Sequence, residues 1–167
     1  KFVENGGFLF AMCSATDSYD IALAMDNLDG VHQVFDGTSI NPEIQNKLDY
    51  NKSFAFSNFK IITDPIIYEF SDIDFPPSNN PISKGAEADY FSLFEFSAKY
   101  DPVPTMLTQN HIPTIKGFMG QTTGFDKKRI KKHIVIMGED PASDQVKYIH
   151  GNYGKGTFTF YGGHDPE

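Results

Sequence analysis

The chain has 167 residues, 40% hydrophobic and 22% charged, which is typical of one globular domain with a sizeable core. Its net charge of −8 argues against nucleic acid or anionic membranes as partners, because both require surfaces rich in Lys and Arg. The lone cysteine excludes an internal disulfide, and no apolar run approaches the roughly 18 residues that span a bilayer, so we expect no membrane insertion.

The first predicted element is a buried parallel strand over residues 8–12, a continuous apolar run. It ends at Cys13, which has the small residues Ala11 and Ala15 on either side. A strand that ends in small-x-Cys-x-small and leads into a helix has the pattern of a nucleophile elbow, in which the side chain stands on a tight turn at the edge of a sheet. The pattern also fits a buried structural cysteine that follows a core strand.

A helix is expected next, over residues 18–27, with Asp17 or Ser18 as its N-cap. Asp17, Asp20 and Asp26 are predicted to form the cap and the solvent-exposed face of this helix. The strand, turn and helix together indicate an α/β crossover, in which a ligand site lies at the carboxyl ends of the strands.

The middle of the chain predicts a short helix and several strand-like pieces. The helix covers residues 42–48, and the strands are expected at residues 53–56, 59–62, 66–70, 90–96, 114–119 and 134–137. Residues 72–89 are rich in Pro and Asn, and we predict a surface loop insertion there.

The last part of the chain predicts a β-hairpin, with strands over 145–150 and 157–161 and a glycine-rich turn over 151–156. This turn lacks the GKS or GKT ending of a phosphate-binding loop, so we predict no nucleotide cofactor. His, Cys, Asp and Glu show no zinc-ligand spacing anywhere in the sequence, and a metal site is not expected.

His164 follows the second hairpin strand, with Asp165 and Glu167 close behind it. A thiol, an imidazole and a carboxylate at the ends of strands form a constellation for nucleophilic catalysis. Cys13 would be the nucleophile, His164 the general base, and Asp165 or Glu167 the group that orients the imidazole. The backbone N–H of Ser14 would donate to the oxyanion. A polar loop after the final strand is the alternative interpretation of His164.

Two segments resemble a known family. Residues 5–17 resemble the elbow segment of ThuA-like (trehalose-utilisation) domains, which usually have glycines, an apolar strand, a His at the elbow and then Ala-Thr-Asp. Residues 148–167, with Tyr-Gly-Lys-Gly and Gly-His-Asp-Pro-Glu, resemble the closing hairpin of that family. The whole chain also resembles bacterial proteins labelled asparagine synthetase B.

The resemblance implies a flavodoxin-like α/β fold, a three-layer sandwich around a mostly parallel sheet, as in class I glutamine amidotransferases. It implies a single domain over 1–167 that ends in a β-hairpin, with early strands before Lys1 and a tail after Glu167 missing. The elbow residue is Cys13, as in true glutamine amidotransferases, which favours thiol chemistry.

Three functions follow from these patterns. The first is thiol-dependent amide hydrolysis of the glutaminase type. The second is a non-catalytic binding module for a carbohydrate-like or cell-envelope ligand, and the third is an assembly subunit of a larger polypeptide or complex. The sequence does not distinguish a cytoplasmic from a periplasmic location.

Overall fold

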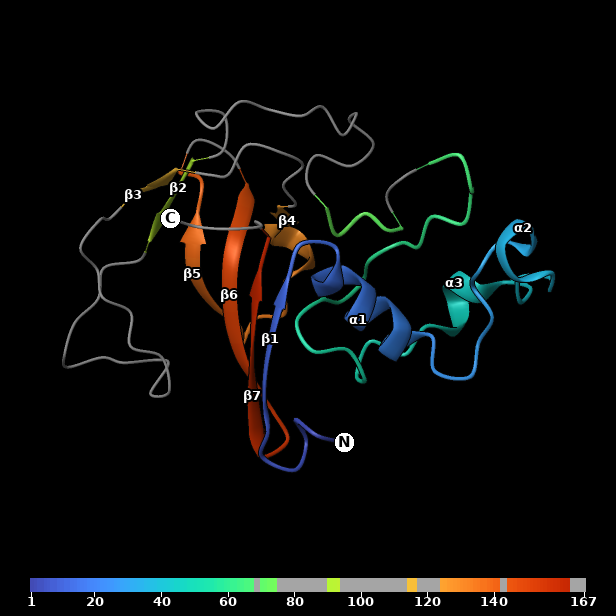
Figure 1. Ribbon diagram of the computed structural model, residues 1–167, viewed down its shortest axis with the longest axis horizontal. Helices are drawn as coiled ribbons and strands as arrows, with labels where there is room; N and C mark the ends of the chain where they lie inside the picture. The colour runs from blue at the N-terminus through green and yellow to red at the C-terminus, as the bar shows by residue number, and fades with distance from the viewer. Residues whose placement is uncertain (68–69, 75–89, 94–113, 117–123, 142–143, 163–167) are drawn as a thin grey trace.

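The computed structural model describes residues 1–67, 70–74, 90–93, 114–116, 124–141 and 144–162 (Figure 1). Strands predominate among its regular elements. They are β1 (Phe8–Met12), α1 (Ala15–Ala24), α2 (Gln33–Asp36), α3 (Ile44–Lys47), β2 (Tyr90–Leu93), β3 (Thr114–Lys116), β4 (Phe125–Asp126), a 3₁₀ helix (Lys127–Arg129), β5 (Val135–Glu139), β6 (Gln145–Tyr153) and β7 (Gly156–Tyr161).

All seven described strands belong to one mixed sheet, with the order β1-β7-β6-β5-β2-β3 and with β4 paired to β6. Only β1 and β7 run parallel, and the other described pairs are antiparallel. The sheet is strongly curled, like half of a barrel (Figure 1).

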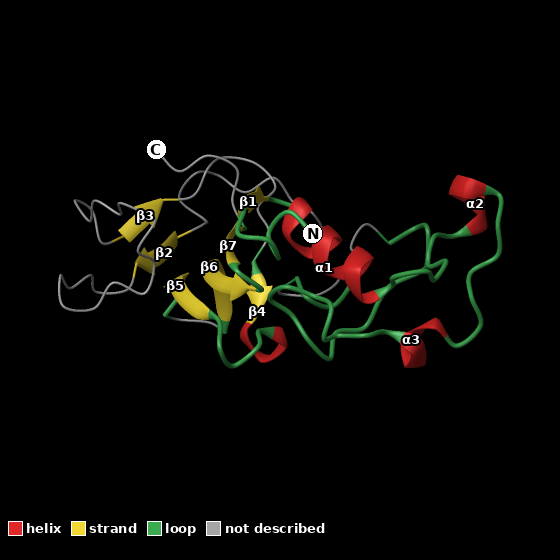
Figure 2. Cartoon of the chain, turned by 90° about the horizontal axis from the view of Figure 1, so that it is seen from below, coloured by secondary structure: helices red, strands yellow, loops and turns green. Residues whose placement is uncertain are grey.

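The predicted flavodoxin-like sandwich is therefore wrong. A mostly parallel sheet needs crossover connections of a dozen or more residues, usually helices that cover its faces. Here Gly154 and Lys155 alone join β6 to β7, which makes this pair antiparallel. In the part of the chain that the structure describes, α1 has ten residues and α2 and α3 have four each. Figure 2 shows that α2 and α3 lie away from the sheet.

The predicted hairpin is confirmed, with a tighter turn than expected. Residues Tyr148 to Tyr153 pair with Tyr161 to Gly156 in unbroken register. Gly154 has φ +62°, a left-handed conformation that glycine adopts without steric cost. The prediction succeeds because alternating residues and a glycine at the turn are local signals.

The predicted strand over residues 8–12 is also confirmed, as β1, and it is parallel to β7. Its burial is less complete than predicted, because β1 is the edge strand of the described sheet and Phe8 and Phe10 remain 45% exposed. The helix after it begins at Ala15 and ends at Ala24, three residues earlier at each end than predicted.

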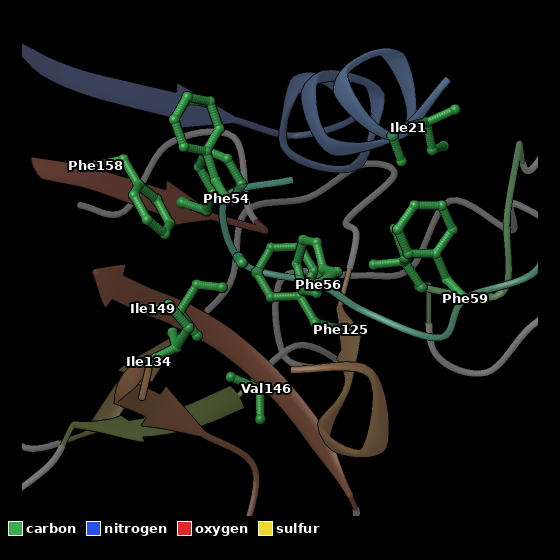
Figure 3. Packing of buried hydrophobic residues seen from close by; sticks show 14 of the residues in the cluster. Ile21, Phe54, Phe56, Phe59, Phe125, Ile134, Val146, Ile149 and Phe158 are labelled. Atoms are coloured by element: carbon green, nitrogen blue, oxygen red, sulfur yellow. The ribbon is translucent and has the colours of Figure 1, made fainter. Parts of the chain in front are cut away.

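A cluster of aromatic side chains forms the core between the sheet and the segment 53–59 (Figure 3). Phe54 lies 5.1 Å from Phe158, and Phe56 lies 5.1 Å from Phe125, measured between ring centroids. Such pairs add ~0.5–1.5 kcal/mol each beyond the burial of apolar area. The core therefore fastens a central segment to β4 and β7.

The predicted strands over 53–56, 59–62 and 66–70 are wrong where the structure describes them. This region has only isolated bridges, such as Phe56 with Ile130 and Ile61 with Ser71. The helix predicted over 42–48 is present as α3, and the strands predicted near 90, 114 and 134 are present as β2, β3 and β5.

Of the predicted surface insertion over 72–89, the structure describes residues 72–74. Ile73 is fully buried there, and Asp74 forms a bridge with Phe125. Residues 75–89 lie outside the described residues, as do residues 94–96 and 117–119 of two predicted strands.

Candidate functional site

Cys13 occupies the turn between β1 and α1 in a left-handed backbone conformation, with φ 54°. A residue other than glycine rarely adopts positive φ, because the conformation costs on the order of 1–3 kcal/mol and persists only where its surroundings impose it. The side chain is partly exposed rather than buried in the core. The alternative prediction, a buried structural cysteine at position 13, is therefore wrong.

Three hydrogen bonds hold the backbone of Cys13 in this turn. Its N–H donates to the carbonyl oxygen of Tyr161 at 3.0 Å, which continues the pairing of β1 with β7. Its carbonyl oxygen accepts the N–H of Thr16 at 3.1 Å and the Thr16 hydroxyl at 2.7 Å. Thr16 itself is fully buried. The turn is fixed from both sides.

The N-terminus of α1 begins directly beyond Cys13. Ser14 is the N-cap residue, with its side chain making no cap hydrogen bond, and Ala15 is the first helical residue. No described group accepts the N–H of Ser14. The positive end of a helix and an uncommitted N–H beside a thiol can both stabilise negative charge.

The other predicted site residues, His164, Asp165 and Glu167, lie outside the described residues. The structure does describe the strand that leads to them. β7 ends at Tyr161, directly beside the Cys13 turn, and the N–H of Gly162 donates to the carbonyl oxygen of Lys147 at 2.7 Å. The carboxyl ends of β1 and β7 thus meet at one edge of the sheet.

Sequence reasoning missed two carboxyl groups on α1. Asp17 and Asp20, predicted on the solvent-exposed side of the helix, are 1% and 0% exposed. They were detectable in principle, because positions 17, 20, 21 and 24 share one helical face and the last two are Ile21 and Ala24. Aspartates on an apolar face are rarely buried without a reason.

The two aspartates differ in their partners. Asp20 accepts the backbone N–H groups of Phe54, Ala55 and Phe56 at 2.6, 2.7 and 2.7 Å. Burial raises its pKa to about 6, against the opposing effect of these three donors. Asp17 accepts the N–H of its neighbour Ser18 at 2.9 Å, and burial raises its pKa to about 7. Asp17 therefore keeps its proton over most of the acidic range.

Two of the described histidines, His32 and His150, have structural partners of their own. His32 is the N-cap of α2, where its Nδ1 accepts the N–H of Val34 at 3.2 Å. His150 is buried on β6, its Nδ1 lies 2.9 Å from the hydroxyl oxygen of Thr159, and burial lowers its pKa. His150 pairs with Thr159 of β7, and Thr159 pairs with Phe10 of β1. Phe10 is two residues before the end of β1.

Among the described residues, no group of three or more His, Cys, Asp or Glu side chains could hold a metal ion. No described helix is long and apolar enough to cross a membrane. Comparison of the chain with protein-family models, curated proteins and solved structures finds no match. The resemblance to ThuA-like domains and to asparagine synthetase B stays a prediction that rests on its motifs.

Proposed function

We propose that the protein is a thiol-dependent amide hydrolase in which Cys13 is the nucleophile. The observation that supports this most directly is the left-handed conformation of Cys13 between a strand and a helix, with φ 54°. Backbone strain of this kind concentrates at functional sites, where it presents a side chain at the edge of a sheet. The hydrogen bonds to Tyr161 and from Thr16 hold the turn in this conformation, which keeps the Cys13 side chain at the strand end.

The proposed base is His164, with Asp165 or Glu167 to orient it. Chain connectivity supports this assignment, because β7 ends beside Cys13 and His164 is two residues beyond Gly162. Consecutive Cα atoms are 3.8 Å apart, so the Cα of His164 is within ~8 Å of the Gly162 Cα. An imidazole at that reach can contact a thiol at the neighbouring strand end.

The proposed reaction has two steps. The Cys13 thiolate attacks the carbonyl carbon of an amide, and the N–H of Ser14 donates to the oxygen that becomes negative. The C–N bond then breaks as the His164 imidazolium gives its proton to the leaving amine, which leaves a thioester. Water, deprotonated by His164, attacks this thioester and releases the carboxylic acid and the free thiol.

Alkylation kinetics test the nucleophile directly. Iodoacetamide should label Cys13 in the folded protein at least ~10-fold faster at pH 6 than in the urea-unfolded chain, because an unassisted thiol is almost entirely protonated there. His164→Ala should remove this excess rate. His133→Ala is the matched control, since His133 is an exposed histidine elsewhere in the chain.

Ammonia release tests the reaction itself. We expect the wild-type protein to release ammonia from primary amides, with glutamine as the first member of the panel, and Cys13→Ser to release none. Labelling no faster in the folded than in the unfolded chain would overturn the proposal. So would ammonia release that survives in Cys13→Ser.

A further inference from the structure

An apolar groove lies on the side of α1 that faces away from the sheet. The cavity has a volume of about 390 Å³ between α1, residues 30–35 and the described part of residues 61–70. Apolar side chains dominate its lining, among them Ile21, Met25, Val31, Phe35, Ile61 and Ile67. Cys13 does not line this groove, which makes it independent of the proposed catalytic site.

Large apolar side chains also remain exposed along both sides of the groove. On one side the lining residue Phe35 is 68% exposed and its neighbour Val34 70%, and on the other the lining residue Phe70 is 53% exposed. Ile66, which lies between the lining residues Pro65 and Ile67, is 91% exposed. Isolated exposed apolar residues are ordinary, but a cluster around a cavity marks an interaction site. The apolar surface extends beyond the cavity itself, so the complementary partner is larger than a ligand that only fills the cavity.

Hydrogen bonds hold both sides of the groove in place. Asp29 accepts the N–H of Val31 at 3.1 Å and the hydroxyl of Thr38 at 2.6 Å, which fixes the segment before α2. Across the groove, Asp64 accepts the N–H of Ile66 at 2.9 Å through its side chain. These hydrogen bonds therefore fix the turns that carry the exposed apolar side chains.

The surroundings of the groove are acidic. Between residues 2 and 46 the sequence has seven Asp or Glu and no Lys or Arg. Asp64 lines the groove, and Asp29 and Asp36 are next in sequence to the lining residues Gly30 and Phe35. No described Lys or Arg forms an ion pair with any of the three. A partner of matching chemistry has an apolar stripe with positive charges beside it.

Backbone chemistry selects the conformation of such a partner. The described lining consists of residues of α1 and α2 and of irregular segments, with no strand whose free edge could pair with an added strand. An extended peptide would bring unpaired N–H and C=O groups into an apolar groove, which is unfavourable. A helix satisfies its own backbone groups and needs only side-chain contacts.

We propose that this groove is a docking site for a basic amphipathic helix of a partner protein. Apolar residues at positions i, i+3, i+4 and i+7 of that helix would enter the groove between Phe35 and Phe70, and flanking Lys or Arg would face Asp64. The interaction is separate from any chemistry at Cys13.

Fluorescence anisotropy tests the proposal with a labelled 18-residue peptide of Leu and Lys, in which Leu forms one helical stripe. The wild-type protein should bind it, and a Phe35→Ser, Phe70→Ser double variant should bind at least ~10-fold more weakly, since both line the groove and are exposed anchors for the apolar stripe. Phe2→Ser is the matched control with unchanged affinity, because Phe2 is 71% exposed and precedes β1.

Two further comparisons isolate the charge and the helical stripe. Asp64→Asn keeps the acceptor for Ile66 and removes the charge, so it should weaken binding severalfold at low salt and little at high salt. A peptide with Glu in place of Lys and a scrambled Leu/Lys peptide should both bind poorly. Equal binding of either peptide, unchanged affinity of the double variant, or binding of a small apolar dye without any binding of the helical peptide would overturn the proposal.

Discussion

The carboxylate of Asp20 accepts the backbone N–H of Phe54 at 2.6 Å, across 34 positions of the chain. The same carboxylate also accepts the next two N–H groups, so one side chain of α1 satisfies three consecutive backbone donors. Phe54 in turn packs on Phe158 of β7. The helix that begins beside Cys13 is thereby fastened to the aromatic core.

Asp20→Asn should destabilise the fold by ~2–4 kcal/mol, because the amide group has only one acceptor oxygen for three buried donors, and each unsatisfied donor costs ~1–3 kcal/mol. Urea unfolding followed by circular dichroism measures the loss. Asp26→Asn, two residues beyond the end of α1, is the matched control. Its exposed pair with Lys52 should be worth at most ~1 kcal/mol. A loss for Asp20→Asn no larger than the control contradicts the role assigned to Asp20.

Asp17 makes stability depend on pH in a defined direction. Burial raises its pKa from 3.8 to about 7, so between these values the folded state binds more protons than the unfolded state. Its contribution to stability is complete below pH 3.8 and is lost as the pH rises through about 7. The slope from this group approaches ~1.4 kcal/mol per pH unit within that window.

Asp17→Asn isolates this contribution, because the amide does not ionise. The free energy of unfolding of the variant, relative to wild type, should rise between pH 5 and pH 8, measured by urea unfolding at each pH. A constant difference between Asp17→Asn and wild type across this range would show that Asp17 does not titrate as stated.

These buried carboxylates also explain why part of the fold could not be predicted. Residues 53–56 have the composition of a strand, yet the N–H groups of Phe54, Ala55 and Phe56 all bond to Asp20 instead of to a neighbouring strand. Strand propensity records side-chain preference and contains no information about a distant carboxylate. By contrast, β1 and the β6–β7 hairpin follow from local patterns, and both were predicted.

The predicted direction of strand pairing was the larger error. A strand followed by a helix suggested a parallel α/β architecture, and the pairing of β1 with β7 is indeed parallel. The remaining described strands connect to neighbours in antiparallel fashion, which depends on contacts between segments far apart in the sequence. At the site, the small residues around Cys13 predicted its turn correctly, whereas Asp17 was misplaced because its helix begins at Ala15.

The strain at Cys13 has a measurable consequence for stability. At φ 54° a Cβ atom costs energy that glycine does not incur. Cys13→Gly should therefore be about 1 kcal/mol more stable than Cys13→Ala, compared by thermal or urea unfolding. Ala15→Gly, two residues on in the helix, is the control of opposite sign, because glycine lowers helix stability there. If Cys13→Gly proves less stable than Cys13→Ala, the turn is not strained.

Gly156 is the position where β7 meets the residues before β1. A Cβ atom added there would lie 2.1 Å from the carbonyl oxygen of Val3 and 2.2 Å from that of Gly7, both backbone atoms that cannot move aside cheaply. The N–H of the next residue, Thr157, donates to the Gly7 carbonyl at 3.1 Å, so any shift would break the start of the β1–β7 pairing. Gly156→Ala should destabilise the protein by roughly 3 kcal/mol or more, as a forced backbone displacement in a packed sheet does.

Amide hydrogen exchange measures which strands lose protection in this variant. In Gly156→Ala the amides of β1 and the Cys13 N–H should exchange faster, since their partners are on β7. The amides of β5 that pair with β6 should keep more of their protection, because that pairing does not involve Gly156. Thr157→Ala, a half-exposed neighbour in the same strand, is the control that should leave β1 protected. Wild-type protection of β1 in Gly156→Ala would mean that the close approach of Gly156 to Val3 and Gly7 does not maintain the parallel pair.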